Sequence, residues 1–151
     1  GDTNNRGDHS NEMGDNLPFM NLGTDLIPID IQIGYSFICF LFDNKKIKCS
    51  GNGGAGQLGN EKSGDIGDNQ YEAGDNVTYV MLNDTDVVSS MHSSAYSFHV
   101  CVILVSQYMK CWGRNDYYQL GYGDANNRGN AANSMNSTNL LTVNLETESR
   151  V

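Results

Sequence analysis

The chain repeats itself, and this feature constrains its fold more than any other. The run Lys-Cys-Ser-Gly-Asn at the start of 48–59, followed by Gly-Gln-Leu-Gly at its end, reappears at 110–121 as Lys-Cys-Trp-Gly-Arg-Asn and Tyr-Gln-Leu-Gly. The heptapeptide Gly-Asp-Thr-Asn-Asn-Arg-Gly at 1–7 returns at 123–129 with a single difference. Both pairs fit a period of about 61 residues, and self-similarity at a fixed period is the signature of a repeat architecture. We therefore expect a protein built from equivalent structural units.

The period divides residues 1–151 into repeat one at 1–60, repeat two at 61–122 and a partial third repeat at 123–151. One such unit cannot bury its faces alone, and about three are usually needed for stability. We therefore expect either a part of a longer chain or a protomer that needs neighbours.

Short apolar runs rich in β-branched residues, with turn residues between them, predict an all-β fold. No run shows a convincing helical period, and the abundant Gly, Asn and Asp suit tight turns. The expected strands lie at 17–22, 27–33, 35–42, 46–49, 77–82, 87–91, 97–105, 108–112 and 140–145.

The four cysteines repeat with the same period. Cys39 and Cys49 stand at the same spacing as Cys101 and Cys111. In an antiparallel hairpin centred on Asn44 the first pair would lie opposite each other, within reach of a disulfide. Since equivalent units should bond equivalently, we expect Cys39–Cys49 and Cys101–Cys111, and such bridges imply an oxidising compartment. Four free buried thiols are the alternative; a zinc site is disfavoured because the spacing has no Cys-x-x-Cys knuckle.

Three Asn-x-Thr sequons begin at Asn76, Asn83 and Asn136. Each is an acceptor sequence for an N-linked glycan in a secreted protein, although a chain this rich in Asn, Ser and Thr taken together also yields sequons by chance. Together with the paired cysteines they predict a secreted or cell-surface glycoprotein.

The charge of the chain excludes some partners. The formal net charge is −9, and the single dense basic run, 45–48, is short. Phosphate contacts need clustered Lys and Arg, so nucleic-acid binding is not expected. No apolar run reaches the roughly 18 residues that a transmembrane helix requires, so no membrane span is expected.

The repeated motif resembles that of the regulator-of-chromosome-condensation repeat family. The matching pattern is an aliphatic strand ending in Gly34, a strand carrying a Cys, and then Lys-Cys-(Trp)-Gly-x-Asn-x-x-x-Gln-Leu-Gly, best matched at 110–121. The cysteines and the Met-Gly-Asp-Asn-Leu-Pro loop at 13–18 are similar to the secreted and cell-surface variant. The resemblance implies that 1–151 is a single propeller segment, with about two full four-stranded blades and part of a third. Ser50 departs from the pattern, because it stands where the family has Trp.

The sequence contains no catalytic set with supporting spacing, so we do not expect an enzyme, a cofactor or a metal. His9, His92 and His99 fall at unrelated phases of the repeat. The dense Asp and Asn loops leave calcium binding open, although none matches a twelve-residue calcium loop. Tyr117 and Tyr118 are candidate partner-binding residues, because exposed aromatic side chains are enriched in protein interfaces.

These observations predict an extracellular structural or protein-interaction module, whose open sheet faces must be covered by protein partners or by self-association. Such a module could be a subunit of a glycosylated surface or filamentous assembly. The alternative function is a secreted propeller that binds or inhibits another protein through its loops.

Overall fold

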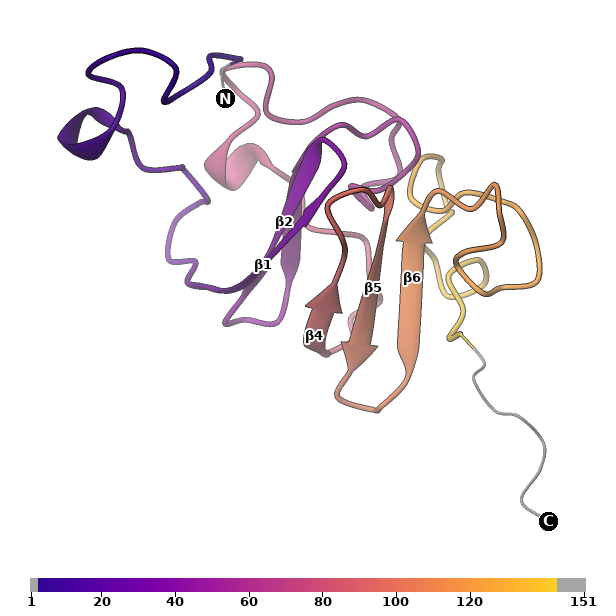
Figure 1. Ribbon diagram of the computed structural model, residues 1–151. Coiled ribbons are helices and arrows are strands. Elements are labelled where there is room, and N and C mark those ends of the chain that lie inside the picture. The colour runs from indigo at the N-terminus through magenta and orange to yellow at the C-terminus, as the bar shows by residue number, and fades with distance from the viewer. Residues whose placement is uncertain (1–2, 144–151) are drawn as a thin grey trace.

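The computed structural model describes residues 3–143 and consists of two small antiparallel sheets packed face to face (Figure 1). The first sheet has the strand order β1-β2-β3 and the second has the order β4-β5-β6. The strand bounds are β1 Pro28–Gly34, β2 Phe37–Phe42, β3 Ile47–Gly51, β4 Val88–His92, β5 His99–Leu104 and β6 Met109–Gly113. The prediction of an all-β repeat fold is confirmed.

The described helices are two single 3-10 turns, η1 Gly14–Asn16 and η2 Gly74–Asn76, which occupy equivalent places in successive repeats. Neither has the length or the apolar character needed to cross a bilayer. Both occur in Gly-Asp-Asn sequences whose glycine has a positive φ, 66° in η1 and 63° in η2.

The two sheets repeat each other in detail. In each, a register shift interrupts the pairing near the start of the first strand, between Pro28 and Asp30 and between Val88 and Ser90. The later pairs align as well: β2 and β3 pair through Cys39 and Cys49, as β5 and β6 pair through Cys101 and Cys111. Residues of one sheet can therefore be compared with their equivalents in the other.

The predicted outer strands at 17–22 and 77–82 do not form as hydrogen-bonded ladders in the structure. Instead, a segment of the following repeat lies beside the third strand of each sheet and makes one backbone bond to it. Val80 N–H donates to the Ile47 carbonyl, and Val143 N–H donates to the Met109 carbonyl, both at 2.8 Å. The next residue of the first segment, Met81, already donates to Gly59, so the segment turns away before a ladder can develop. The predicted strand at 140–145 is described only up to residue 143.

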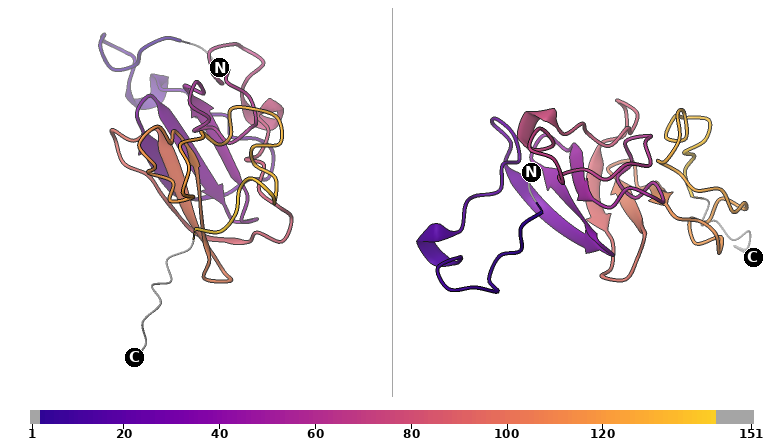
Figure 2. Two further views of the ribbon diagram at one scale, coloured as in Figure 1. Left: turned by 90° about the vertical axis from the view of Figure 1, so that its right-hand side faces the viewer. Right: turned by 90° about the horizontal axis from the view of Figure 1, so that it is seen from above.

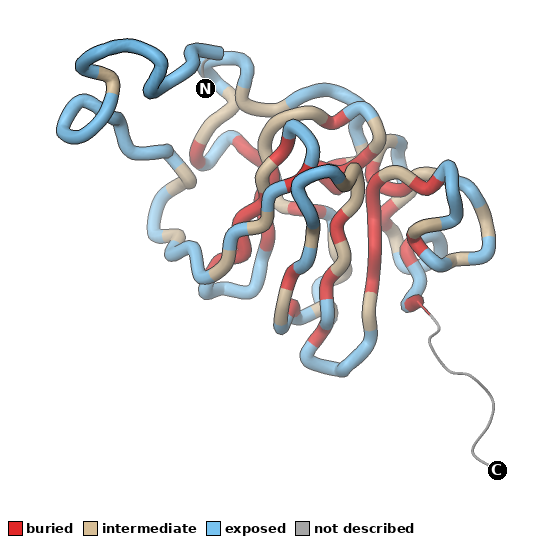
Figure 3. The backbone as a smooth tube through the Cα atoms, viewed as in Figure 1, coloured by how far each residue is buried: buried red, intermediate tan, exposed pale blue. Residues whose placement is uncertain are grey.

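The main core lies between the two sheets, where the buried positions of the tube concentrate (Figure 3). Seen from above, an N-terminal loop, the first sheet, the second sheet and a C-terminal loop follow one another in a row (Figure 2). Each sheet therefore has one face in the core and one face directed toward a loop. The predicted repeat boundaries at 60/61 and 122/123 fall in loops between or after the strands.

Candidate functional site

The contact between the two sheets shows what a covered sheet face looks like in this protein. We call the face of a sheet that carries the even-numbered residues of its middle strand the upstream face, and the opposite face the downstream face. The downstream face of the first sheet contributes Phe37, Cys39, Leu41, Ile47 and Cys49 to the core. The upstream face of the second sheet contributes Met91, Val100, Val102, Leu104 and Trp112.

Trp112 is the central side chain of this contact. It is fully buried, and its indole N–H donates to the Gln57 carbonyl at 3.1 Å. The ring packs where Gly59 has no side chain: a Cβ there would lie 2.9 Å from the indole nitrogen. Gly59 also has a φ of 61°, a conformation that glycine adopts at little cost. The Gln-Leu-Gly part of one repeat is thus the socket for the Trp of the next.

The upstream face of the first sheet is only partly covered: Phe40 and Phe42 are buried on it, but its β1 residues are not. Ile31 occupies the position of Met91, since each lies opposite the fourth residue of its neighbouring strand, yet Ile31 is 50% exposed and Met91 is 0% exposed. Ile33, on the same face, is 59% exposed, and Ile38 is only partly buried where its equivalent Val100 is fully buried.

A hollow of about 1170 Å³ separates this upstream face from the N-terminal loop. Ser50 lines it at the position that Trp112 holds in the second sheet. The other lining residues include Phe19, Ile33, Ile38, Phe40 and Lys48. Lys48 ties two segments to the sheet, because its ammonium group donates to the carbonyl of Leu22 in the N-terminal loop at 3.3 Å and to that of Gly74 in η2 at 2.9 Å.

The downstream face of the second sheet is the other partly open face. Ile103 occupies the position of Leu41, and it is 41% exposed where Leu41 is 1% exposed. Cys101 and Met109 are partly exposed on the same face, and their equivalents Cys39 and Ile47 are buried. The described part of the molecule therefore has two partly open faces, one of each kind that its internal contact joins; on the second, Cys111 is already buried with Leu120 and Val143.

The two predicted disulfides are present. Cys39 and Cys49 are bonded across β2 and β3, and Cys101 and Cys111 are bonded across β5 and β6, with Cα–Cα distances of 4.1 Å in both pairs. The alternative of four free thiols is therefore wrong for this structure. Each bridge clamps the hairpin that forms the centre of its sheet.

The three sequons lie outside the strands. Asn76 is exposed at the end of η2, whereas Asn83 and Asn136 are partly buried. The Asn136 side-chain oxygen accepts from the backbone N–H groups of Thr138 and Asn139, both at 3.0 Å, so this sequon is folded into an Asx turn. The threonine of each sequon is exposed. Glycan occupancy stays a prediction.

Tyr117 and Tyr118 lie in the loop after β6 and are 77% and 64% exposed. Tyr117 belongs to a row of rings in the loops next to the two sheets. The Arg114 guanidinium lies 5.8 Å from the Tyr117 ring and 5.6 Å from the Phe98 ring, and Phe98 contacts Tyr35 in the turn between β1 and β2, with centroids 4.7 Å apart. We call Tyr35, Phe98, Arg114 and Tyr117 the aromatic rim.

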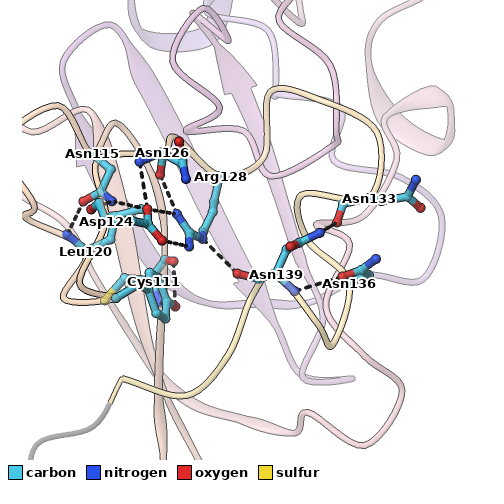
Figure 4. A network of polar contacts seen from close by, with 10 residues as sticks. Cys111, Asn115, Leu120, Asp124, Asn126, Arg128, Asn133, Asn136 and Asn139 are labelled. Atoms are coloured by element: carbon cyan, nitrogen blue, oxygen red, sulfur yellow. Dashed lines mark hydrogen bonds and ion pairs between the residues drawn. The ribbon is translucent and has the colours of Figure 1, made fainter.

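A polar network closes the loop that follows β6 (Figure 4). Arg128 donates to both oxygens of Asp124 at 2.9 and 2.8 Å and to the Asn139 carbonyl at 2.8 Å. These hydrogen bonds from Arg128 lower the pKa of Asp124 to about 2. Asn115 also donates to Asp124, and it accepts from Leu120 N–H at 2.9 Å. Because every member has partners within the loop, this network has a structural role.

The acidic loops are mostly used internally. Within residues 3–143, Asp8, His9 and Glu12 form the one cluster of potential metal ligands. Glu12 already accepts from the backbone N–H groups of Gly7 and His9 at 2.9 and 3.0 Å. The cluster lies in an exposed loop, and the Glu12 carboxylate stabilises the backbone of that same loop. Calcium binding stays an open prediction.

Sequence reasoning missed the buried ion pair between Lys110 and Asp86, which are 2.6 Å apart and 7% and 9% exposed. It also missed Arg114 and Phe98 as members of the aromatic rim. Lys110 and its equivalent Lys48 were visible as a repeated Lys-Cys pair, but their partners come from distant loops.

Comparisons with known proteins identify the fold. No family model matches the sequence, and no curated protein matches it. A chain in the crystal structure of Kap60 bound to yeast RCC1 (Prp20) matches with a TM-score of 0.54 and 15% identity, over 74% of this chain and 25% of that one. The crystal structure of Prp20p from Saccharomyces cerevisiae, described with its binding properties to Gsp1p and histones, matches with a TM-score of 0.57 and 12% identity.

The chain has an RCC1-like repeat fold. The second match covers 83% of this chain and 27% of Prp20p, so the chain spans about a quarter of the length of these proteins. At such identities the likeness shows the fold alone. The two sheets are thus blades of a partial RCC1-like β-propeller, and the disulfides fit the cysteine-bearing variant that the sequence resembles.

Proposed function

We propose that this chain is a non-catalytic extracellular protein-interaction module, a subunit of a glycosylated surface or filamentous assembly. One observation carries the proposal: Ile31 and Ile103 are 50% and 41% exposed at positions whose equivalents, Met91 and Leu41, are buried in the contact between blades. Apolar blade faces left in water are interaction surfaces that a partner must cover.

The extracellular part of the proposal is supported by chemistry. Two disulfides fit an oxidising compartment, because cytosolic thiols are kept reduced. The exposed sequon at Asn76 is accessible for glycan transfer. The solved RCC1-like structures also point toward proteins as partners, since their descriptions name Kap60, Gsp1p and histones.

The proposal is tested by directing the chain through the secretory pathway of a eukaryotic cell. We expect a secreted product whose mass falls on treatment with a peptide N-glycosidase. The variant N76Q should lose one glycan, while N5Q, which changes an asparagine outside any sequon, should lose none. A secreted chain that carries no glycan would contradict the glycoprotein assignment, and retention of the chain as a misfolded product would contradict the extracellular one.

The alternative function, a secreted propeller that binds or inhibits another protein through its loops, is favoured by the aromatic rim. Its outer residues Tyr35 and Tyr117 are 50% and 77% exposed. Tyr and Arg are the residue types that dominate binding energy in protein interfaces. The variant Y117A should weaken a loop-mediated complex by about 10-fold or more, as expected of a hot-spot residue, and should leave a blade-face contact unchanged.

A further inference from the structure

A loop of the second repeat is joined to the end of β3 through one carboxylate. The Asp65 side chain accepts from the backbone N–H of Gly53 at 3.0 Å and from the side-chain nitrogen of Asn52 at 3.1 Å. Two backbone hydrogen bonds between Gly51 and Ile66, at 2.7 and 3.0 Å, continue the same contact. We call this contact the repeat junction, because it joins repeat one to repeat two.

The orientation of the Asn52 amide follows from its neighbours. The Ala55 N–H donates to the side-chain oxygen of Gln57 at 2.9 Å, which turns the side-chain nitrogen of Gln57 toward Asn52. That nitrogen donates to the side-chain oxygen of Asn52 at 2.8 Å, so the nitrogen of Asn52 is the atom that faces Asp65. Because Gln57 is fully buried, its amide keeps these partners. Both ends of the Asn52 amide are therefore held in place.

Asn52 and Gly53 also form the one Asn-Gly pair of the sequence. Such a pair is prone to deamidation, because glycine has no side chain to hinder its own backbone nitrogen. In this reaction the glycine nitrogen loses its proton and attacks the side-chain carbonyl carbon of the asparagine. The new C–N bond closes a cyclic imide, and the bond to the side-chain nitrogen breaks and releases ammonia. Water then opens the imide to aspartate or isoaspartate.

We propose that Asn52 is a latent site of spontaneous deamidation and that Asp65 protects it. The Asp65 carboxylate binds both nitrogens that the reaction uses, the Gly53 nitrogen that attacks and the Asn52 nitrogen that leaves. A negative charge beside the Gly53 N–H also opposes the loss of its proton. The site reacts when the loop that carries Asp65 opens. Since the reaction needs only water, this inference does not depend on the proposed function.

Deamidation turns the attraction across the repeat junction into repulsion. The product carries a carboxylate where Asn52 has its amide, and a carboxylate accepts hydrogen bonds but donates none. It would face the Asp65 carboxylate, which now lies 3.1 Å from the Asn52 nitrogen, and like charges so close repel each other. Closing the loop does not reverse the reaction, because the ammonia has left. Each event therefore loosens the junction between repeats one and two permanently.

The test follows the peptide that contains Asn52 by mass spectrometry while the full chain is incubated at mildly alkaline pH, either folded or unfolded in guanidinium chloride. We expect the folded chain to deamidate at least about 10-fold more slowly than the unfolded chain, because the hydrogen bonds of the junction must open first. The variant D65A removes the acceptor and should bring the rate of the folded chain to within about 3-fold of the unfolded rate.

The variant D65N is the matched control, because an amide oxygen can accept the same hydrogen bonds. The second sheet shows this arrangement, since the Asn127 side-chain oxygen accepts from the Asn115 N–H at 2.7 Å. D65N should therefore deamidate at Asn52 at least about 3-fold more slowly than D65A. Circular dichroism verifies that both variants are folded.

Hydrogen exchange measures the consequence in the variant N52D, which carries the charge of the product. The backbone amides of Gly53 and Ile66 should exchange at least about 10-fold faster than in the unchanged chain. Equal deamidation of the folded and unfolded chains would overturn the protected site, and this comparison needs no variant. A D65A chain as slow as the unchanged one, or a D65N chain as fast as D65A, would overturn the role of the Asp65 hydrogen bonds. Unchanged exchange in N52D would overturn the loosening of the junction.

Discussion

Replacing Trp112 with Ser, the residue found at the equivalent position of the first sheet, should remove the central buried side chain of the contact between the blades. The side chain is fully buried and is the one Trp of the chain. Truncating a buried Trp typically costs about 3–5 kcal/mol. The lost indole bond also leaves the buried Gln57 carbonyl without its donor, which adds about 1 kcal/mol or more. The expected loss of about 4–6 kcal/mol is a large part of the 5–15 kcal/mol that stabilises a typical domain.

The loss is measured by urea unfolding followed by far-ultraviolet circular dichroism, because W112S removes the only Trp fluorophore. With a slope of about 2 kcal/mol per molar urea, the midpoint should fall by about 2–3 M. W112F keeps most of the ring volume and loses the N–H donor, so it should cost about 1–2 kcal/mol. The matched variant S50A should change the unfolding free energy by less than about 0.5 kcal/mol. A W112S variant whose free energy of unfolding lies within about 1 kcal/mol of that of the unchanged chain would refute the account in which Trp112, packed beside Gly59, holds the blades together.

Three further outcomes follow from the same structure. The double variant C101A/C111A should lose about 2–3 kcal/mol of unfolding free energy, the value expected for a loop of this length, and equal urea midpoints before and after the change would count against it. Asp124 has a pKa of about 2 in the folded chain, below its ordinary value of 3.8. Its contribution is therefore present above about pH 4 and is lost as the pH falls toward 2; allowing for partial exposure it amounts to about 1 kcal/mol, and D124N should flatten stability over that pH range. Gly59→Ala should cost about 1–3 kcal/mol in urea unfolding, because its Cβ would lie 2.7 Å from Val80 and 2.9 Å from Trp112; an unchanged midpoint would show that the socket can relax.

The sequence predicted most of the strands and both disulfides because these depend on local patterns. The runs 37–42 and 99–104 are apolar and are flanked by turn residues, and the Cys spacing matches the geometry of a hairpin. The prediction of the outer strands was wrong because contacts between distant parts of the chain divert these segments. The segment containing Val80 has strand-forming residues, but Met81 is already bound to Gly59 rather than to β3.

The candidate site could be predicted only in part. Ile31 and Met91 are equally apolar, so the sequence gives no sign that one is exposed and the other buried; the difference depends on which neighbour covers each face. Tyr117 could be identified from composition alone. Its connection to Tyr35 could not, because Phe98 and Arg114 join them across more than one strand and two repeats.

The single hydrogen bonds from Val80 to Ile47 and from Val143 to Met109 show that each blade is finished by residues of the following repeat. Every unit of about 61 residues therefore completes its predecessor and is completed by its successor. Duplicating or deleting a whole unit preserves this interlock at each junction, whichever residue is chosen as the starting point. The number of units can then change during evolution while the contacts between neighbouring units stay the same.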